Sequence, residues 1–269
     1  MPSYRRTRVS KAAPLVWGAL LIVVGGANRA VSGGFAEVRS VRSAVDVRAI
    51  VVDDRGFVWS AGQEGVCRHD GASWRCPSAI PAVALARGRD GSVWAASRDG
   101  RVRSVSPAGA HDLIFEPSMG EVRALAESQE GDLFMGGGGG GAIVRSARSC
   151  PAPCRALTIL NLPVVAAASV NQRMLVAAGE VLWSVSHRGA PQQLWRAPRR
   201  ITSLAATTPE RWWVATEDLV VYDVTPSGVR QVSLAERFED IRALVGTSDG
   251  ALWAGGTAGV FRGDLTATR

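Results

Sequence analysis

Few side chains in this sequence could carry acid–base or metal chemistry. The 269 residues include three histidines, His69, His111 and His187, and all three fall in or near predicted turns or outer strands. General acid–base catalysis needs such a side chain within hydrogen-bond reach of a partner, and no acid–base pair is identified from the sequence. We therefore predict no catalytic residues, no metal ligands and no cofactor.

The four cysteines form two pairs that are close in the sequence. Cys67 and Cys76 flank a predicted hairpin that turns at Asp-Gly. A four-residue loop would place these two cysteines opposite each other, within disulfide reach, whereas a two-residue loop would pair Cys67 with Trp74. Cys150 and Cys154 could close a local bridge. We predict two disulfides in an oxidising compartment; free thiols and a metal site are the alternatives.

Residues 136–141 are six consecutive glycines. Such a run can cradle a phosphate in a P-loop, but that mechanism also needs a following Lys-Ser/Thr and a helix, and neither is present. We predict an expanded, flexible loop between two strands.

The N-terminal segment explains most of the net charge of +7 and the pI of 10.2. Four basic residues between Arg5 and Lys11 precede an uncharged stretch at 12–28, which is the order of a secretory signal. These 17 residues are marginal for a span, which needs about 20, so an uncleaved anchor is the alternative. We predict that residues 1–30 direct export to the periplasm or the outside, and that any membrane contact is made through this segment alone.

The rest of the chain is nearly neutral. Beyond residue 29 there are 26 basic and 24 acidic residues. A nucleic-acid-binding domain would carry a basic patch or stripe, so we expect no nucleic-acid partner.

A repeat with a period near 40 residues organises the chain from residue 47 onward. Each copy contains a short apolar strand, a turn, a second strand with a large apolar anchor, a Gly-rich loop and a third strand. The anchor positions are Trp59, Trp94, Phe134, Leu175, Trp213 and Trp253. Short strands, frequent turns and this period are typical of an all-β fold, the β-propeller.

We predict six blades of four antiparallel strands within residues 31–269. The repeats are expected near 47–81, 82–121, 122–163, 164–200, 201–240 and 241–263. The last copy ends before a fourth strand, and residues 34–40 alternate in polarity without another role. We expect residues 34–40 to supply the outer strand of the last blade and to close the ring.

The repeat resembles the two-component-regulator propeller repeat, which is found in the periplasmic sensor parts of membrane-bound histidine kinases. The resemblance is carried by Ile241–Arg262 and Val47–Arg68, and more loosely by 82–103 and 122–145. This chain has about six repeats and no recognisable kinase, receiver or DNA-binding segment. The resemblance therefore implies the fold, export and binding of a ligand or partner.

Three arginines occupy one position of the repeat, the start of the innermost strand: Arg48, Arg123 and Arg242. That strand lines the central channel of a propeller, so the three guanidinium groups could ring one mouth and attract a carboxylate, a sulfate or an acidic sugar. Alternatively, each arginine pairs with the acid two residues upstream. The loops between second and third strands open on the same face and contribute Gln63, Glu64, Arg98, Asp99, Glu217, Asp218 and Thr257.

These patterns predict an exported, non-catalytic, monomeric propeller that binds a ligand or another protein. The expected partner is an anionic small molecule or glycan, or an envelope protein. The alternatives are a propeller lyase or glycoside-active enzyme, which would need an acid–base pair at the channel mouth, and a structural factor in envelope assembly.

Overall fold

The computed structural model describes residues 47–53, 55, 57–69, 73–116, 119–170, 173–232, 241, 243–246, 252–256 and 259–263. All regular secondary structure in these ranges is β-strand. No helix in this part of the chain is long and apolar enough to cross a membrane. The predicted leader at 1–30 and the predicted closing strand at 34–40 lie outside the described residues.

Six antiparallel sheets follow one another along the described chain, and we number them as blades 1 to 6. Blade 1 contains β1 (Val47–Val52), β2 (Val58–Gly62), β3 (Gly65–His69) and β4 (Trp74–Ser78). Blade 2 contains β5 (Ala84–Arg87), β6 (Val93–Ala96), β7 (Val102–Ser106) and β8 (Gly109–Leu113). Blade 3 contains β10 (Ala124–Glu127), β11 (Leu133–Gly137), β12 (Gly140–Val144) and β13 (Cys154–Leu160), and β9 (Phe115–Glu116) pairs in parallel with β13 at its outer edge.

The remaining blades have the same strand order. Blade 4 contains β14 (Val164–Val170), β15 (Arg173–Ala178), β16 (Val181–Ser186) and β17 (Gly189–Arg196). Blade 5 contains β18 (Ile201–Thr208), β19 (Arg211–Thr216), β20 (Val221–Thr225) and β21 (Gly228–Val232). Blade 6 contains β22 (Ala243–Gly246), β23 (Leu252–Gly256) and β24 (Gly259–Gly263) among the residues that the structure describes.

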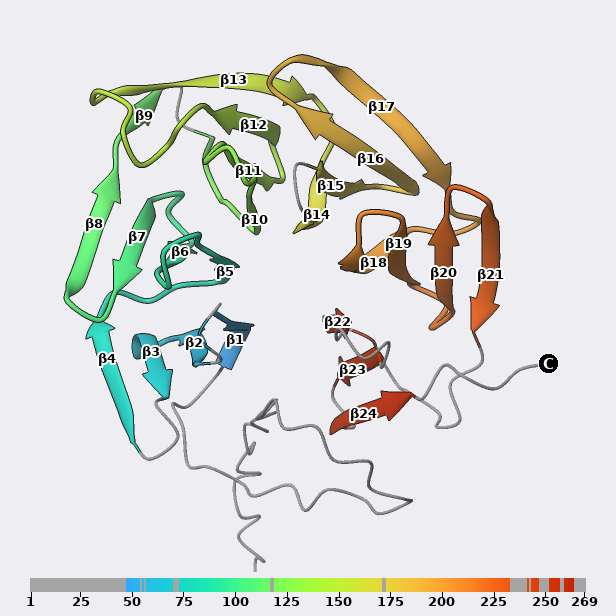
Figure 1. The fold of residues 1–269 in the computed structure, drawn as a ribbon, viewed down its shortest axis with the longest axis horizontal. Coiled ribbons are helices and arrows are strands. Elements are labelled where there is room, and N and C mark those ends of the chain that lie inside the picture. Colours follow the sequence, from blue (N-terminus) through green and yellow to red (C-terminus); the bar gives the residue numbers. More distant parts are fainter. Residues whose placement is uncertain are drawn as a thin grey trace, which may run out of the picture.

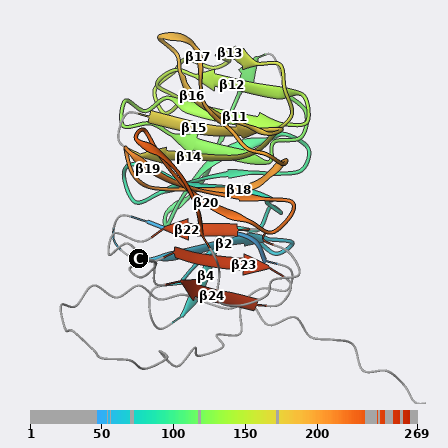
Figure 2. The same cartoon turned by 90° about the vertical axis from the view of Figure 1, so that its right-hand side faces the viewer.

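The blades are arranged around a central axis, with the first strand of each blade innermost (Figure 1). Successive inner strands pack side by side, from β1 beside β5 through to β18 beside β22. Figure 2 shows the ring edge-on, with the strands running across its thickness. The chain therefore has the β-propeller fold that the repeat predicts.

Large apolar side chains on the second strands fill the space between neighbouring blades. Trp59 is fully buried against Ala82 and Val93 of blade 2, and Trp213 packs against Ile241 and Leu244 of blade 6. Trp94, Phe134 and Leu175 are likewise at most 2% exposed and belong to clusters shared with the following blade. The side chain of Trp253 lies outside the described residues. Each of blades 1 to 5 thus buries its anchor against the next blade, which a single sheet could not do.

Both cysteine pairs form disulfides, Cys67–Cys76 and Cys150–Cys154. β3 and β4 pair His69 with Trp74, so four residues separate the two strands. This is the loop length that places Cys67 opposite Cys76, and the alternative pairing of Cys67 with Trp74 is wrong.

The six glycines at 136–141 do not form an expanded loop, and this prediction is wrong. Gly136 pairs with Gly141, and Gly137 with Gly140, so the run forms the ends of β11 and β12 around a two-residue turn. The physical reason is close packing. A Cβ atom on Gly136 would lie 2.6 Å from the Val164 side chain, and one on Gly137 would lie 1.9 Å from the carbonyl oxygen of Glu121.

We predict that Gly137→Ala destabilises the fold, because its Cβ would meet backbone that cannot move aside. Overpacking of this kind costs about 1–3 kcal/mol. Gly138→Ala is the matched control, because nothing lies within 4 Å of a Cβ atom there. It should change the free energy of unfolding by less than about 0.5 kcal/mol. Urea denaturation of both variants measures the difference, and equal stabilities would contradict the role of close packing.

We predict that deletion of residues 34–40 lowers the melting temperature strongly, because blade 6 would lose its outer strand. A loss of several kcal/mol corresponds to roughly 10 °C for a domain of this size. Deletion of residues 264–269, which are predicted to form no strand, is the control and should have little effect. If the two deletions melt at the same temperature, the closure hypothesis fails.

Candidate functional site

The antiparallel strands give the propeller two faces. We call one of them the rim face; it carries the starts of the inner strands and the turns between second and third strands. The opposite face, which we call the far face, carries the turns between first and second strands and between third and fourth strands. The predicted ligand-binding residues that the structure describes belong to the rim face, because they lie at inner-strand starts or in second–third turns.

A β-bulge recurs where an inner strand begins. The register between first and second strands shifts at Arg48 in β1, at Val165 in β14 and at Thr202 in β18. A bulge leaves one extra residue unpaired and redirects its side chain. The residues just before two of these bulges, Val164 and Ile201, are buried between blades, whereas the bulge residues themselves have accessible surface. In blade 1 the bulge residue, Arg48, is exposed, whereas Val165 and Thr202 are half-buried and Val165 packs against the core between blades 4 and 5.

Of the three predicted arginines, Arg48 and Arg123 are exposed at this position, and Arg242 lies outside the described residues. Arg123 donates a hydrogen bond of 2.7 Å to the carboxylate of Glu121. This is the pairing with the acid two residues upstream that the alternative interpretation expects. An exposed ion pair contributes only about 0–1 kcal/mol, so a stronger anion could displace Glu121 from Arg123.

Arg98 belongs to the same patch of the rim. The hydrogen bond from Arg123 lowers the pKa of Glu121, and the positive charges of Arg123 and Arg98 act in the same direction, against a smaller opposing effect of desolvation. Arg98, in the turn between β6 and β7, therefore lies near enough to the Arg123–Glu121 pair to influence it. The structure brings together predicted residues of blades 2 and 3.

Two predicted rim residues stabilise their own turns. The hydroxyl of Ser97 donates to Asp99 (2.5 Å), and the hydroxyl of Thr216 donates to Asp218 (2.6 Å). The hydrogen bond from Ser97 also lowers the pKa of Asp99. The same hydroxyl-x-Asp turn thus recurs in blades 2 and 5. The other predicted turn residues, Gln63, Glu64 and Glu217, are exposed in their turns, and Thr257 lies outside the described residues.

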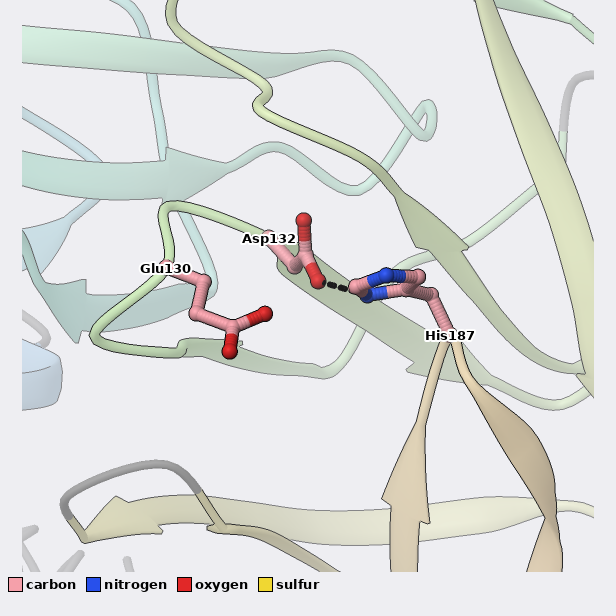
Figure 3. A group of neighbouring side chains, drawn as sticks. All are labelled: Glu130, Asp132 and His187. Carbon is pink, nitrogen blue, oxygen red and sulfur yellow. Dashed lines mark hydrogen bonds and ion pairs between the residues drawn. The ribbon is translucent and has the colours of Figure 1, made fainter.

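The far face holds a cluster that the sequence interpretation missed. His187, in the turn between β16 and β17, points at Asp132, which ends the turn between β10 and β11 (Figure 3). Nδ1 of His187 hydrogen-bonds the carboxylate of Asp132, and Glu130 lies beside them. Potential ligand atoms of the three residues all lie within 4.8 Å of one another.

Neighbouring groups hold this cluster in place. The second carboxylate oxygen of Asp132 accepts the backbone N–H of Ser146 (3.0 Å), and Glu130 forms a 3.0 Å ion pair with Arg188. The residues were missed because 55 positions separate Asp132 from His187. Comparing the first turn of one repeat with the last turn of the next would have suggested their proximity.

No protein-family model and no curated protein sequence matches this chain. Solved structures do. The chain is similar to a streptogramin B lyase, at 13% identity and a TM-score of 0.66, over 80% of this chain and 78% of that one. It is also similar to the WD40 β-propeller domain of Doa1, at 11% identity and a TM-score of 0.64, over 80% and 77% of the two chains.

A third similar structure is the extracellular domain of BT4673 from B. thetaiotaomicron, described as a hybrid two-component system. The identity is 17% and the TM-score 0.58, and the match covers 82% of this chain and 32% of that one. At these identities the three similarities show the fold. They include a lyase, a WD40 domain and an extracellular domain of a signalling protein, so they leave the activity open.

We predict that Arg123→Ala raises the pKa of Glu121, because it removes the hydrogen bond that stabilises the carboxylate. The effect should appear in a carbon-detected NMR titration of the glutamate carboxyl groups. Arg75→Ala, which removes an exposed arginine of β4, is the control and should leave the pKa of Glu121 unchanged. An unchanged pKa in Arg123→Ala would mean that the pair is not formed in solution.

Proposed function

We propose that this protein is an exported, non-catalytic β-propeller that binds an anionic ligand at the rim face. The observation that carries the proposal is the bulge at the start of the inner strands, which directs Arg48 away from the blade interface at the position where Arg123 is also exposed. Bulges are common where a side chain must be re-aimed toward a site. Guanidinium groups suit carboxylate, sulfate and phosphate because they can donate two parallel hydrogen bonds.

Further support comes from the surroundings of these arginines. The positive charges of Arg98 and Arg123 both act on one carboxylate, that of Glu121. A ligand carboxylate or sulfate group could take the place of Glu121 on Arg123. The two disulfides and the structural similarity to the extracellular domain of BT4673 support an exported location.

The distribution of the histidines favours a binding module over an enzyme at the rim. His69 ends β3 and His187 follows β16, so both lie at the far face, and His111 lies within the outer strand β8. None of the three histidines of the chain therefore reaches the rim face. Acid–base catalysis at the rim would therefore lack a histidine, and two of the rim carboxylates, Asp99 and Asp218, accept hydrogen bonds within their own turns.

Binding of anionic oligosaccharides tests the proposal. The wild-type protein should bind a sulfated or uronic-acid oligosaccharide more tightly than a neutral one of the same length. The triple variant Arg48→Ala, Arg123→Ala, Arg242→Ala should lose affinity at least about tenfold, because it removes charge-assisted hydrogen bonds. Isothermal titration calorimetry measures both comparisons.

A second triple variant controls for net charge. Arg75, Arg145 and Arg155 are exposed and lie away from the rim face, in β4, after β12 and in β13. Their joint replacement by alanine removes the same charge and should leave binding unchanged. Equal losses in the two triple variants would indicate non-specific attraction, and unchanged binding in the rim variant would reject the arginine site.

A further inference from the structure

The junction between blades 3 and 4 brings together the donor types of a transition-metal site. It combines one imidazole with two carboxylates, and the residues come from two different blades: Glu130 and Asp132 from the first turn of blade 3, His187 from the last turn of blade 4 (Figure 3). Asp132 is the most buried of the three, with a side chain 6% exposed, and His187 is 11% exposed. Burying a carboxylate is costly unless a positive charge or hydrogen bonds compensate for the lost hydration.

The junction between blades 2 and 3 shows how the fold compensates buried carboxylates elsewhere. There, the guanidinium of Arg148, from the last turn of blade 3, donates to Glu127 at 2.9 Å and pairs with Asp90 of blade 2 at 3.1 Å. The side chain of Glu127 is fully buried, and Asp90 occupies the first turn of its blade. A cationic group from one blade therefore lies between two carboxylates and joins neighbouring blades.

The junction between blades 3 and 4 has the same arrangement of turns but different side chains. Glu130 precedes a glycine in the first turn of blade 3, as Asp90 does in blade 2, and pairs with Arg188 in the way that Asp90 pairs with Arg148. Asp132 stands where blade 2 has Ser92, so here the buried carboxylate belongs to the first turn of the preceding blade. The side chain that reaches this carboxylate is an imidazole, which is a metal ligand when it is neutral.

We propose that Glu130, Asp132 and His187 bind a divalent transition-metal ion, with Zn²⁺ as the representative, and that the ion joins blades 3 and 4. Imidazole nitrogen together with carboxylate oxygen suits Zn²⁺ and its neighbours, whereas Ca²⁺ and Mg²⁺ favour sites made of oxygen alone. The positive charge of the ion compensates the carboxylates and joins the two blades, as the guanidinium of Arg148 does at the preceding junction. The backbone N–H of Ser146 orients Asp132 from the side away from His187.

Zinc binding by the full-length protein, freed of metal with a chelator, tests this site. Calorimetry should show one Zn²⁺ bound per chain, and the ion should raise the melting temperature, because it binds the folded state alone. Mg²⁺ and Ca²⁺ at the same concentration should do neither. His187→Gln and Glu130→Gln should each weaken Zn²⁺ binding at least about tenfold.

Two further variants distinguish a metal site at this junction from zinc binding elsewhere on the protein and from a purely structural cluster. His111→Gln removes an exposed histidine of β8 and should leave zinc binding unchanged. Arg188→Ala removes the guanidinium that competes for Glu130, and should therefore raise the affinity for Zn²⁺. A purely structural role of the cluster predicts no such gain. Glu130 has a side chain 35% exposed, so Glu130→Gln remains a valid test even if His187→Gln does not fold.

The proposal is overturned if the wild-type protein binds no Zn²⁺, if His111→Gln abolishes binding, or if Arg188→Ala weakens it. The site lies on the far face, and the ligand of the proposed function would lie on the rim face. The two proposals can therefore fail independently.

Discussion

Burial of one large side chain per blade against the following blade is the interaction on which this propeller depends. A four-stranded sheet has two faces, and neither can be left in water when both carry apolar residues. Trp59, Trp94, Phe134, Leu175 and Trp213 supply this contact at five successive junctions. Replacement of such a residue by alanine typically costs about 3–5 kcal/mol, so a single junction carries a large part of the stability of a domain.

The same packing determines what the rim face can present. Val164 and Ile201 are buried in the junctions, and the bulge residue that follows each of them, Val165 or Thr202, is half-buried. Packing and exposure are thus coupled within two residues of the repeat. The residue at this position is arginine, valine or threonine in the three blades that have the bulge: Arg48, Val165 and Thr202.

At the far face, turns that belong to neighbouring blades contact each other. Between blades 2 and 3 and between blades 3 and 4, the last turn of one blade lies against the first turn of the preceding blade, and charged side chains there connect the two. Arg148 stacks over the Trp94 ring at 4.9 Å while it pairs with two carboxylates, and thereby joins the packed core to the surface. At the next junction His187 and Asp132 occupy the corresponding place. The buried anchors are similar from blade to blade, whereas the charged side chains at the turn contacts differ. These differing side chains can give one junction a specific chemistry.

The repeat in the sequence determined the strand order, the anchor positions and the face on which the candidate arginines lie, because each of these follows from local patterning within one copy. The loop length that pairs Cys67 with Cys76 remained open in the sequence and was decided by the register of β3 and β4. The pairing of Arg123 with Glu121 was one of two expected arrangements, since their separation in the sequence allows contact without requiring it.

Tertiary structure alone decided the role of the glycines at 136–141 and the existence of the far-face cluster. A run of glycines looks the same in the sequence whether it forms a loose loop or a strand end packed against other backbone. The contacts with Val164 and Glu121 distinguish the two cases here, and both residues lie outside the hairpin. Asp132 and His187 likewise meet only because blades 3 and 4 are adjacent. Local patterning predicts what one repeat forms, and contacts between repeats depend on how the blades pack.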